Sequence, residues 1–211
     1  MKRILVTGSG GIGGVNFVRA LKIFQDEFFI VGTDFNKYYL QFADLDQRVI
    51  SPKHSDSNFI SLLNKLTEQH KIEFLHPQPS SEALVVSQNL DKISSKTLLP
   101  SSNIISNDKL ETQKILSTSG IAVAKTKTID NYDLIASAFD ELGGGPLWIR
   151  AKNGAGGNLS LLCDNPSEAE YWMKLWILRK KANFDDFMIQ QYLPKRNIAW
   201  DSFWYNGKLI S

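Results

Sequence analysis

Strand-like and helix-like runs alternate along the first 100 residues, and no other feature of the sequence constrains the fold as strongly. Residues 3–7, 28–33 and 72–76 are short, mostly apolar runs that are typical of buried strands. Helical periodicity separates them at residues 13–24 and 58–70. Because parallel strands need crossover connections, this order predicts a parallel sheet with helices on both faces. We therefore expect a doubly wound, Rossmann-like α/β domain over residues 1–100.

The sequence changes character after Pro100, where we place a domain boundary. Residues 101–211 mix helices and strands without the regular alternation of the first part, which is typical of an α+β domain. The elements expected here are a helix from about Lys109 to Ser119-Gly120, strands at 126–129, 146–150 and 159–163, helices at 132–142 and 168–181, and a hairpin built on Asn206-Gly207.

The composition excludes several classes of protein. A formal net charge of +2 over 211 residues argues against a nucleic-acid partner. A single cysteine, Cys163, excludes an intrachain disulfide and a cysteine-based zinc site, and the 3 histidines have no metal-ligand spacing. We therefore expect no metal site in this chain. It opens directly into a strand and has no apolar run near the roughly 20 residues of a membrane span, so we expect a cytoplasmic protein with no membrane partner.

A glycine-rich turn, TGSGGIGG at residues 7–14, connects the first strand to the first helix. It contains Gly8-x-Gly10-x-x-Gly13, and Asp34 ends the next strand. This pattern is typical of dinucleotide binding, with the acid on the ribose hydroxyls, and it favours an NAD(P)-dependent reductase or epimerase. Such enzymes use a Tyr-x-x-x-Lys pair for proton transfer, and none of the 6 tyrosines has a lysine four residues later. The oxidoreductase therefore stays an alternative.

A second glycine-rich turn lies in PLWIRAKNGAGGNLSL, residues 146–161, between two strand-like runs. Arg150 and Lys152 precede it, and its tip is Gly154-Ala155-Gly156-Gly157. Glycines allow main-chain N–H groups to approach an anion closely, and fixed cations beside them favour phosphate. The same pattern also fits a surface hairpin with a flexible turn. Both interpretations predict a β-hairpin here.

An ordered set of segments supports the phosphate interpretation. Asn107-Asp108-Lys109 comes first, followed by STSGIAVAKT at 117–126, the hairpin at 146–161 and FMIQQYLPKRNIAWD at 187–201. In this order the segments resemble the ATP-grasp superfamily, in particular the large subunit of carbamoyl-phosphate synthase and related carboxylate–amine ligases. The resemblance implies that residues 1–100 are a pre-ATP-grasp domain. It also implies that residues 101–211 are the N-terminal portion of the ATP-grasp domain, with its helix, lid, hinge and first hairpin.

The resemblance implies ATP-binding roles for particular residues. Lys109 and Arg150 match the two cations that contact phosphates, and Asn197 stands where relatives carry a ribose-binding glutamate. The lid over the triphosphate matches Gly154, Ala155, Gly156 and Gly157, and the adenine-binding hinge matches Gln190, Gln191, Tyr192 and Leu193. Taken singly, Lys109 fits a solvated lysine at a helix start equally well, and Arg150 fits an edge-strand ion pair.

The implied reaction uses Mg-ATP to phosphorylate a small carboxylate-type substrate to an acyl phosphate, which an amine or another nucleophile attacks. The acceptor is expected at the carboxyl ends of the first strands, among Gly10, Gly11, Asp34, Ser80, Ser81 and Glu82. Magnesium ligands in this family lie beyond the position of Ser211. We therefore expect these residues alone to be inactive and to need further sequence, a partner chain or a homo-oligomer. A non-catalytic nucleotide-binding subunit is the remaining interpretation.

Overall fold

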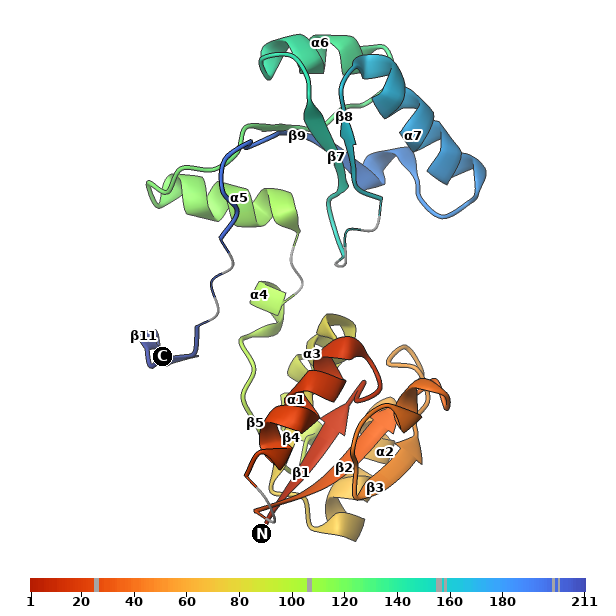
Figure 1. Cartoon of the computed structure of the whole chain (residues 1–211), viewed down its shortest axis with the longest axis vertical. Helices are drawn as coiled ribbons and strands as arrows, with labels where there is room; N and C mark the ends of the chain where they lie inside the picture. Colours follow the sequence, from red (N-terminus) through yellow and green to blue (C-terminus); the bar gives the residue numbers. More distant parts are fainter. Residues whose placement is uncertain (25–26, 106–107, 155–156, 158, 199, 201) are drawn as a thin grey trace. The chain divides into compact units, whose positions relative to one another are not determined.

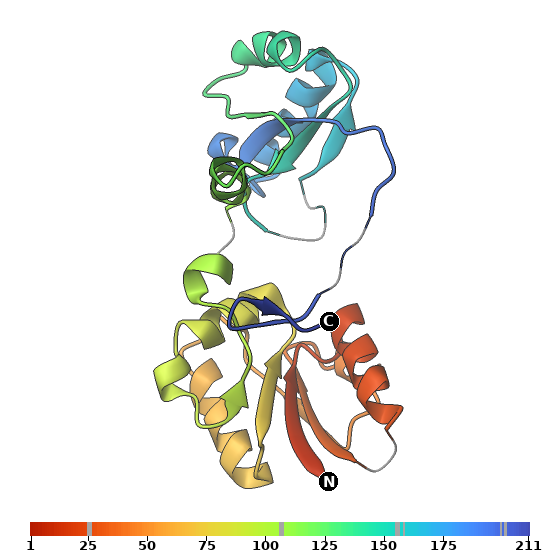
Figure 2. The ribbon, with the colours of Figure 1, turned by 90° about the vertical axis from the view of Figure 1, so that its left-hand side faces the viewer.

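The computed structural model describes residues 1–24, 27–105, 108–154, 157, 159–198, 200 and 202–211. It divides into two compact units, Met1–Asn107 and Asp108–Ser211, which we call the N-unit and the C-unit (Figures 1 and 2). Each unit has its own sheet and its own hydrophobic core. None of the described helices is long and apolar enough to cross a membrane.

The N-unit is built on a parallel sheet of five strands with the order β3-β2-β1-β4-β5. Its elements are β1 (Lys2–Thr7), α1 (Ile12–Lys22), β2 (Phe28–Asp34), η1 (Tyr39–Gln41), β3 (Gln47–Ile50), α2 (Phe59–His70), β4 (Phe74–Pro77), α3 (Ser80–Ser87), η2 (Leu90–Lys92), β5 (Lys96–Thr97) and α4 (Ser102–Ile105). From β1 the chain adds β2 and β3 on one side, and β4 and β5 then pair on the other side of β1. The carboxyl ends of β1 and β4 therefore flank a topological switch point, where ligands of such sheets usually bind.

Helices cover both faces of this sheet. α1 packs on the face that carries Ile4 and Val6, whereas α2 and α3 pack on the face that carries Leu5 and Leu75. Consecutive residues of a strand point to opposite faces, so an unbroken apolar run such as β1 supplies both cores. The predicted doubly wound α/β fold is confirmed in the N-unit.

The C-unit is built on an antiparallel sheet of four strands with the order β6-β9-β7-β8. Its elements are α5 (Lys109–Thr118), β6 (Thr126–Lys127), α6 (Leu134–Glu141), β7 (Leu147–Ala151), β8 (Leu161–Cys163), α7 (Pro166–Leu178), η3 (Phe184–Asp186), β9 (Phe187–Gln191), β10 (Trp204–Tyr205) and β11 (Lys208–Leu209). β7 and β8 form the hairpin predicted at residues 146–161, with Leu147 opposite Cys163 and Ile149 opposite Leu161.

Helices α6 and α7 cover one face of this sheet (Figure 1). Ile135 and Phe139 of α6 and Met173 of α7 pack in one cluster with Leu147 and Ile189 of the sheet. Helix α5, in contrast, has no buried residue. It is fixed at its start, where the Asp108 side chain accepts hydrogen bonds from the N–H groups of the first turn. The core of the C-unit therefore lies on the α6–α7 side, and the other sheet face carries Trp148, Arg150, Met188 and Gln190.

The last two strands form the expected hairpin. β10 and β11 are antiparallel, and Trp204 lies opposite Leu209. Asn206 and Gly207 connect them with φ of 47° and 73°. Positive φ at both central residues is what a two-residue type I′ turn requires, which is why Asn-Gly predicts this hairpin.

Candidate functional site

The face of the C-unit sheet opposite α6 and α7 carries Arg150, which the resemblance assigns to phosphate. We call it the polar face and define it by Trp148, Arg150 and Gln190. Along β7, Leu147 and Ile149 are buried in the α6–α7 core, and side chains alternate, so Trp148 and Arg150 point the other way. Trp148 lies opposite Gln190 of β9, which places Gln190 on the same face. The strand register therefore brings an arginine of β7 beside an amide of β9.

Arg150 is held by a chain of hydrogen bonds across three strands. Its Nη1 donates to Gln190 Oε1 at 2.7 Å, and Gln190 Nε2 donates to Thr126 Oγ1 of β6 at 3.1 Å. Gln190 is 6% exposed, so this amide is fixed inside the unit. Among the described residues, the guanidinium of Arg150 donates no other hydrogen bond, which leaves its remaining N–H groups free for a ligand.

Lys109 lies at the first position of α5 and binds the chain that follows β7. Its Nζ donates to the Gly154 carbonyl at 2.8 Å, and its main-chain N–H donates to the Lys152 carbonyl at 3.0 Å. Burial lowers the pKa of the Lys109 ammonium, the charge of Arg150 lowers it further, and Asp108 opposes both effects. The two cations therefore lie close enough to repel each other.

Neither cation has an ionic partner among the residues that the structure describes. No ion pair in that part of the chain includes Lys109 or Arg150. Gln190 supplies an uncharged acceptor to Arg150 where a carboxylate would neutralise it. Two neighbouring cations that form no ion pair with the described residues favour an anion, and the planar fork of arginine suits phosphate oxygens.

The glycine-rich loop between β7 and β8 lies next to these cations through its contact with Lys109. Gly154 has a φ of 90° and Gly157 a φ of 70°, values that favour glycine. An added Cβ at either glycine would meet no atom within 4 Å, so backbone conformation rather than packing explains them. Ala155 and Gly156, the other predicted lid residues, lie outside the described residues.

The predicted hinge begins inside β9 and continues beyond it. Gln190 and Gln191 are the last residues of β9, and the Gln191 N–H donates to the Lys125 carbonyl at 2.8 Å. Within the described part of the chain, Tyr192 and Leu193 form no backbone hydrogen bond, so their N–H and C=O groups are free. The Tyr192 ring lies edge-on to Trp148, with 6.4 Å between ring centroids. Asn197 follows on the exposed segment after the strand.

Thr126 is a site residue that the sequence analysis missed. Nothing in its local sequence distinguishes it from any threonine at the start of a strand. Its place depends on the alignment of β6 with β9, in which Thr126 lies opposite Gln190. A strand-pairing prediction between residues 126–127 and 187–191 is the signal that would have identified it.

The residues predicted to bind the acceptor substrate lie at the carboxyl edge of the N-unit sheet. Asp34 ends β2, where Oδ2 accepts a hydrogen bond from the Gly10 N–H at 3.2 Å and Oδ1 accepts one from the Asn36 N–H at 2.8 Å. An added Cβ at Gly10 would lie 2.3 Å from the Tyr39 carbonyl carbon, so the turn packs directly on that segment. Gly11 is the N-cap of α1. Asp34 is 4% exposed and serves to hold the turn.

Helix α3 brings the other acceptor residues to the same edge. Ser80 and Ser81 are its first two residues and are exposed, whereas Glu82 is 4% exposed. Burial raises the pKa of the Glu82 carboxyl; the neighbouring Thr7 hydroxyl opposes this effect, and the nearby charge of Asp34 adds to it. Ser80 and Ser81 are therefore the exposed candidates for binding the acceptor substrate, whereas Asp34 and Glu82 are buried in the N-unit.

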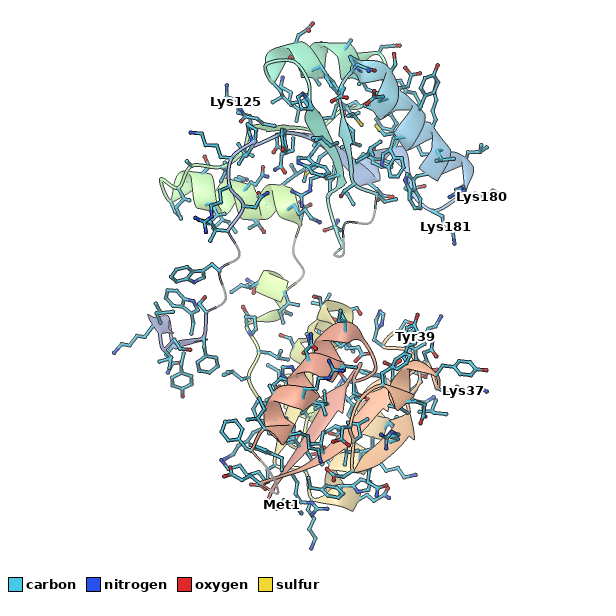
Figure 3. The ribbon with its side chains drawn as sticks, in the orientation of Figure 1. Met1, Lys37, Tyr39, Lys125, Lys180 and Lys181 are labelled. Atoms are coloured by element: carbon cyan, nitrogen blue, oxygen red, sulfur yellow. The ribbon has the colours of Figure 1, made fainter. Side chains whose placement is uncertain are left out.

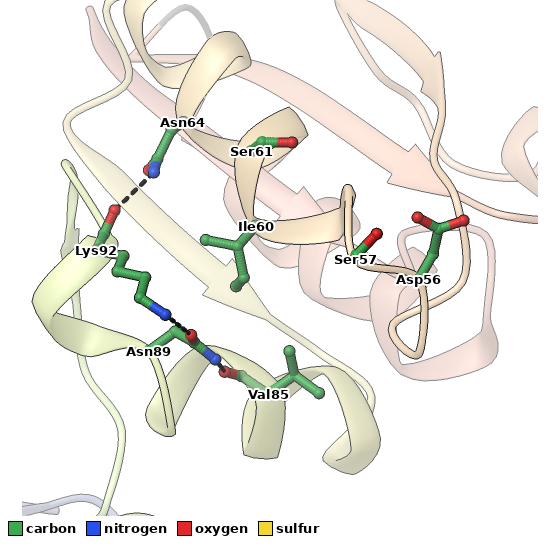
Figure 4. Close-up of a pocket in the computed structure, with 8 residues that line it drawn as sticks. All are labelled: Asp56, Ser57, Ile60, Ser61, Asn64, Val85, Asn89 and Lys92. Carbon is green, nitrogen blue, oxygen red and sulfur yellow. Dashed lines mark hydrogen bonds between the residues drawn. The ribbon is translucent and has the colours of Figure 1, made fainter.

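Two further surface features of the N-unit lie outside the sites described above. A hollow of about 450 Å³ lies between α2 and α3 (Figure 4). Its polar wall residues bond one another: Asn64 donates to the Lys92 carbonyl at 2.6 Å and Lys92 Nζ to Asn89 Oδ1 at 2.9 Å. Figure 3 shows Lys37 and Tyr39 projecting away from the N-unit. We assign no ligand to either feature.

Comparisons with known proteins show which solved structures share this fold. A scan of protein-family models finds no match, and a search of curated proteins finds none either. Among solved structures, an N5-carboxyaminoimidazole synthetase from Staphylococcus aureus complexed with ADP matches at 17% identity with a TM-score of 0.66, over 91% of this chain and 48% of that one.

Two further matches are biotin carboxylases. The biotin carboxylase domain of the 2-oxoglutarate carboxylase from Hydrogenobacter thermophilus, in complex with MgADP, ADP and bicarbonate, matches at 16% identity with a TM-score of 0.63, over 92% of this chain and 44% of that one. The biotin carboxylase–β-γ-ATP complex from Campylobacter jejuni matches at 19% identity with a TM-score of 0.62, over 91% and 45%.

The chain thus spans about half the length of each of these structures. At such identities the likeness concerns the fold alone. The likeness of fold agrees with the resemblance to the ATP-grasp superfamily that the sequence showed.

Proposed function

We propose that the C-unit binds the phosphates of an adenine nucleotide at Lys109 and Arg150. The observation that carries this proposal is the pair of neighbouring cations without an ionic partner among the described residues, next to the loop of Gly154. Arg150 supplies a fork of N–H donors to phosphate oxygens and Lys109 supplies a point charge. The free main-chain groups of Tyr192 and Leu193 offer both a donor and an acceptor to the adenine edge.

We further propose that the whole protein is an ATP-dependent ligase that activates a small carboxylate-type substrate, bicarbonate included. The likeness to ATP-grasp folds supports this class of reaction. We propose more specifically a ligase that resembles carbamoyl-phosphate synthase, as the sequence segments suggest. The role of the cations is to hold the terminal phosphate and to stabilise the negative charge that develops on it during transfer. The acceptor binds at the carboxyl edge of the N-unit sheet, near Gly11, Ser80 and Ser81.

Magnesium does not fit the side chains of this site. Lysine and arginine bind anions, and the Gln190 side-chain oxygen already accepts a hydrogen bond from Arg150, whereas Mg²⁺ needs carboxylate and other oxygen ligands. The described residues contain no group of three or more His, Cys, Asp or Glu that could hold a metal ion. We therefore place no Mg²⁺ among them and propose nucleotide binding, not catalysis, for these residues by themselves.

The geometry of the N-unit disfavours the NAD(P)-dependent alternative. In a dinucleotide site the acid at the end of the second strand binds ribose hydroxyls. Here both oxygens of Asp34 already accept main-chain N–H groups, and the side chain is 4% exposed. The glycine turn packs on the Tyr39 backbone. Gly10 is therefore explained by a close contact inside the protein and not by a contact with a pyrophosphate.

Calorimetric titration of the 211-residue chain with ADP and with NADH tests the proposal. We expect ADP to bind, and we expect Arg150→Ala and Lys109→Ala each to weaken it by about tenfold or more, the effect of about 1.4 kcal/mol for a charge-assisted contact. Arg179→Ala is the matched control, because Arg179 is an exposed arginine at the end of α7. Binding of NADH without ADP, or unchanged ADP affinity in Arg150→Ala, overturns the proposal.

A further inference from the structure

We infer that Gln190 is a positioning residue that orients the Arg150 guanidinium and keeps the phosphate site doubly cationic, so that the site selects diphosphate and triphosphate groups. This inference rests on the proposed nucleotide-phosphate site and deepens it. Gln190 lies 40 residues from Arg150 in the chain, yet its side-chain oxygen accepts the Arg150 Nη1 hydrogen bond at 2.7 Å.

The geometry fixes the amide in one orientation. Gln190 Nε2 donates to Thr126 Oγ1 at 3.1 Å, so its Oε1 is the atom that faces Arg150. With 6% of its surface exposed, Gln190 is held by the strands on both sides, β6 and β7. A guanidinium that is fixed at one N–H group presents the others in a set direction, which lowers the entropy lost when an anion binds. Thr126 thus acts on Arg150 through Gln190.

The charge of Gln190 matters as much as its geometry. A glutamate at this position would accept the same hydrogen bond from Arg150 but would also cancel its charge. The neutral amide leaves both Arg150 and Lys109 uncompensated by any ion pair among the described residues. Burial and, after it, the charge of Arg150 lower the pKa of Lys109, and an anion that contacts both cations relieves their mutual repulsion. An anion with several negative charges, such as a diphosphate, gains most from this arrangement.

Two substitutions separate the two roles of Gln190. Gln190→Met keeps the length of the side chain and removes both hydrogen bonds, so it tests orientation. Gln190→Glu keeps the acceptor for Arg150 and adds a negative charge, so it tests charge. Thr126→Val removes only the anchor of the amide. Gln88→Glu is the matched control, because it adds the same charge at an exposed glutamine of the N-unit.

The measurement is calorimetric titration of the full chain with inorganic pyrophosphate and with ADP at several salt concentrations. We expect Gln190→Glu to weaken pyrophosphate binding by about tenfold or more and to flatten its salt dependence, because one of the two cations is neutralised. We expect Gln190→Met to weaken binding by about fivefold, the effect of one hydrogen bond, with the salt dependence of the wild type. Thr126→Val should fall between Gln190→Met and the wild type, and Gln88→Glu should match the wild type.

A purely structural role for Gln190 predicts something different. Loss of folding would lower the melting temperature and the affinity together, with the same salt dependence in Gln190→Met and Gln190→Glu. That result, or wild-type pyrophosphate affinity in Gln190→Glu, overturns the inference and leaves the nucleotide site intact if ADP binding still depends on Arg150. Failure of the wild type to bind both pyrophosphate and ADP overturns the inference together with the proposed function.

Discussion

At the scale of single residues, the proposed nucleotide site consists of two cations whose charges are not balanced by ion pairs among the described residues. Lys109 begins α5 and Arg150 lies in β7, and each is fixed by neutral acceptors: the Gly154 carbonyl and the Gln190 amide. Neutral acceptors orient a cation without cancelling its charge. This distinguishes the pair from a surface lysine such as Lys22, whose Nζ forms an ion pair with Asp46 at 3.0 Å.

The lowered pKa of Lys109 makes anion binding dependent on pH. Burial is the main cause of the lowering and Arg150 the second. Because only the protonated ammonium attracts phosphate, we expect the affinity for ADP to fall as the pH rises through the lowered pKa, at a lower pH than an ordinary lysine would show. Titrations with ADP at a series of pH values measure this effect.

Lys109→Arg is the control for this pH dependence. Arginine stays protonated over the whole range, so the variant should bind ADP without the alkaline loss. An alkaline loss of the same size in the variant and in the wild type would show that another group titrates.

At the scale of elements, the glycine-rich turn between β1 and α1 is a packing device of the N-unit. Gly10 lies against the backbone of Tyr39 and Leu40, at distances from an added Cβ of 2.3 and 2.7 Å. Gly11, its neighbour, has only the Gly8 carbonyl at 3.5 Å from an added Cβ. The two glycines belong to one motif, but only Gly10 is required by close contact.

We therefore expect Gly10→Ala to destabilise the protein by about 2 kcal/mol or more and Gly11→Ala, at the N-cap of α1, by less than about 1 kcal/mol. The reason is that a methyl group at Gly10 displaces a backbone segment, whereas Gly11 has room and an ordinary φ of −70°. Urea denaturation of both variants measures the difference. Equal losses in the two variants would mean that the motif is required for something other than this contact.

Most elements could be predicted from the sequence because they carry a strong apolar pattern. β2 is the buried run Phe28–Asp34, and the predicted hairpin at 146–161 follows from two apolar runs around glycines. β3 was missed because Gln47–Ile50 is a short strand with mostly exposed side chains at one end of the sheet order. β5 has two residues, which is too short for any periodicity.

The candidate site was predictable only in part. Lys109 and Arg150 were identified by resemblance, because no local pattern relates the start of α5 to a strand that follows another helix. Gln190 was expected in the adenine-binding hinge, and nothing in the sequence predicted that its side chain accepts a hydrogen bond from Arg150. That contact depends on the register of β7 against β9, which turn and helix signals do not encode. The ATP-binding roles themselves stay predictions.

At the scale of the whole molecule, each unit has a glycine-rich turn whose sequence is typical of a nucleotide site, residues 7–14 in the N-unit and 154–157 in the C-unit. The turn of the N-unit, residues 7–14, has its acid engaged by main-chain N–H groups. The turn of the C-unit follows Arg150 and contacts Lys109. We propose that the second turn, not the first, belongs to the nucleotide site.

Amide hydrogen exchange of the full chain with and without saturating ADP tests this claim most directly. We expect slower exchange in residues 109–112, 148–154 and 188–193 when ADP is bound, with no change in residues 7–14 and 34–36. Arg150→Ala should abolish the protection at an ADP concentration that saturates the wild type. Protection of residues 7–14 by ADP, with unchanged exchange around Arg150, would contradict the account.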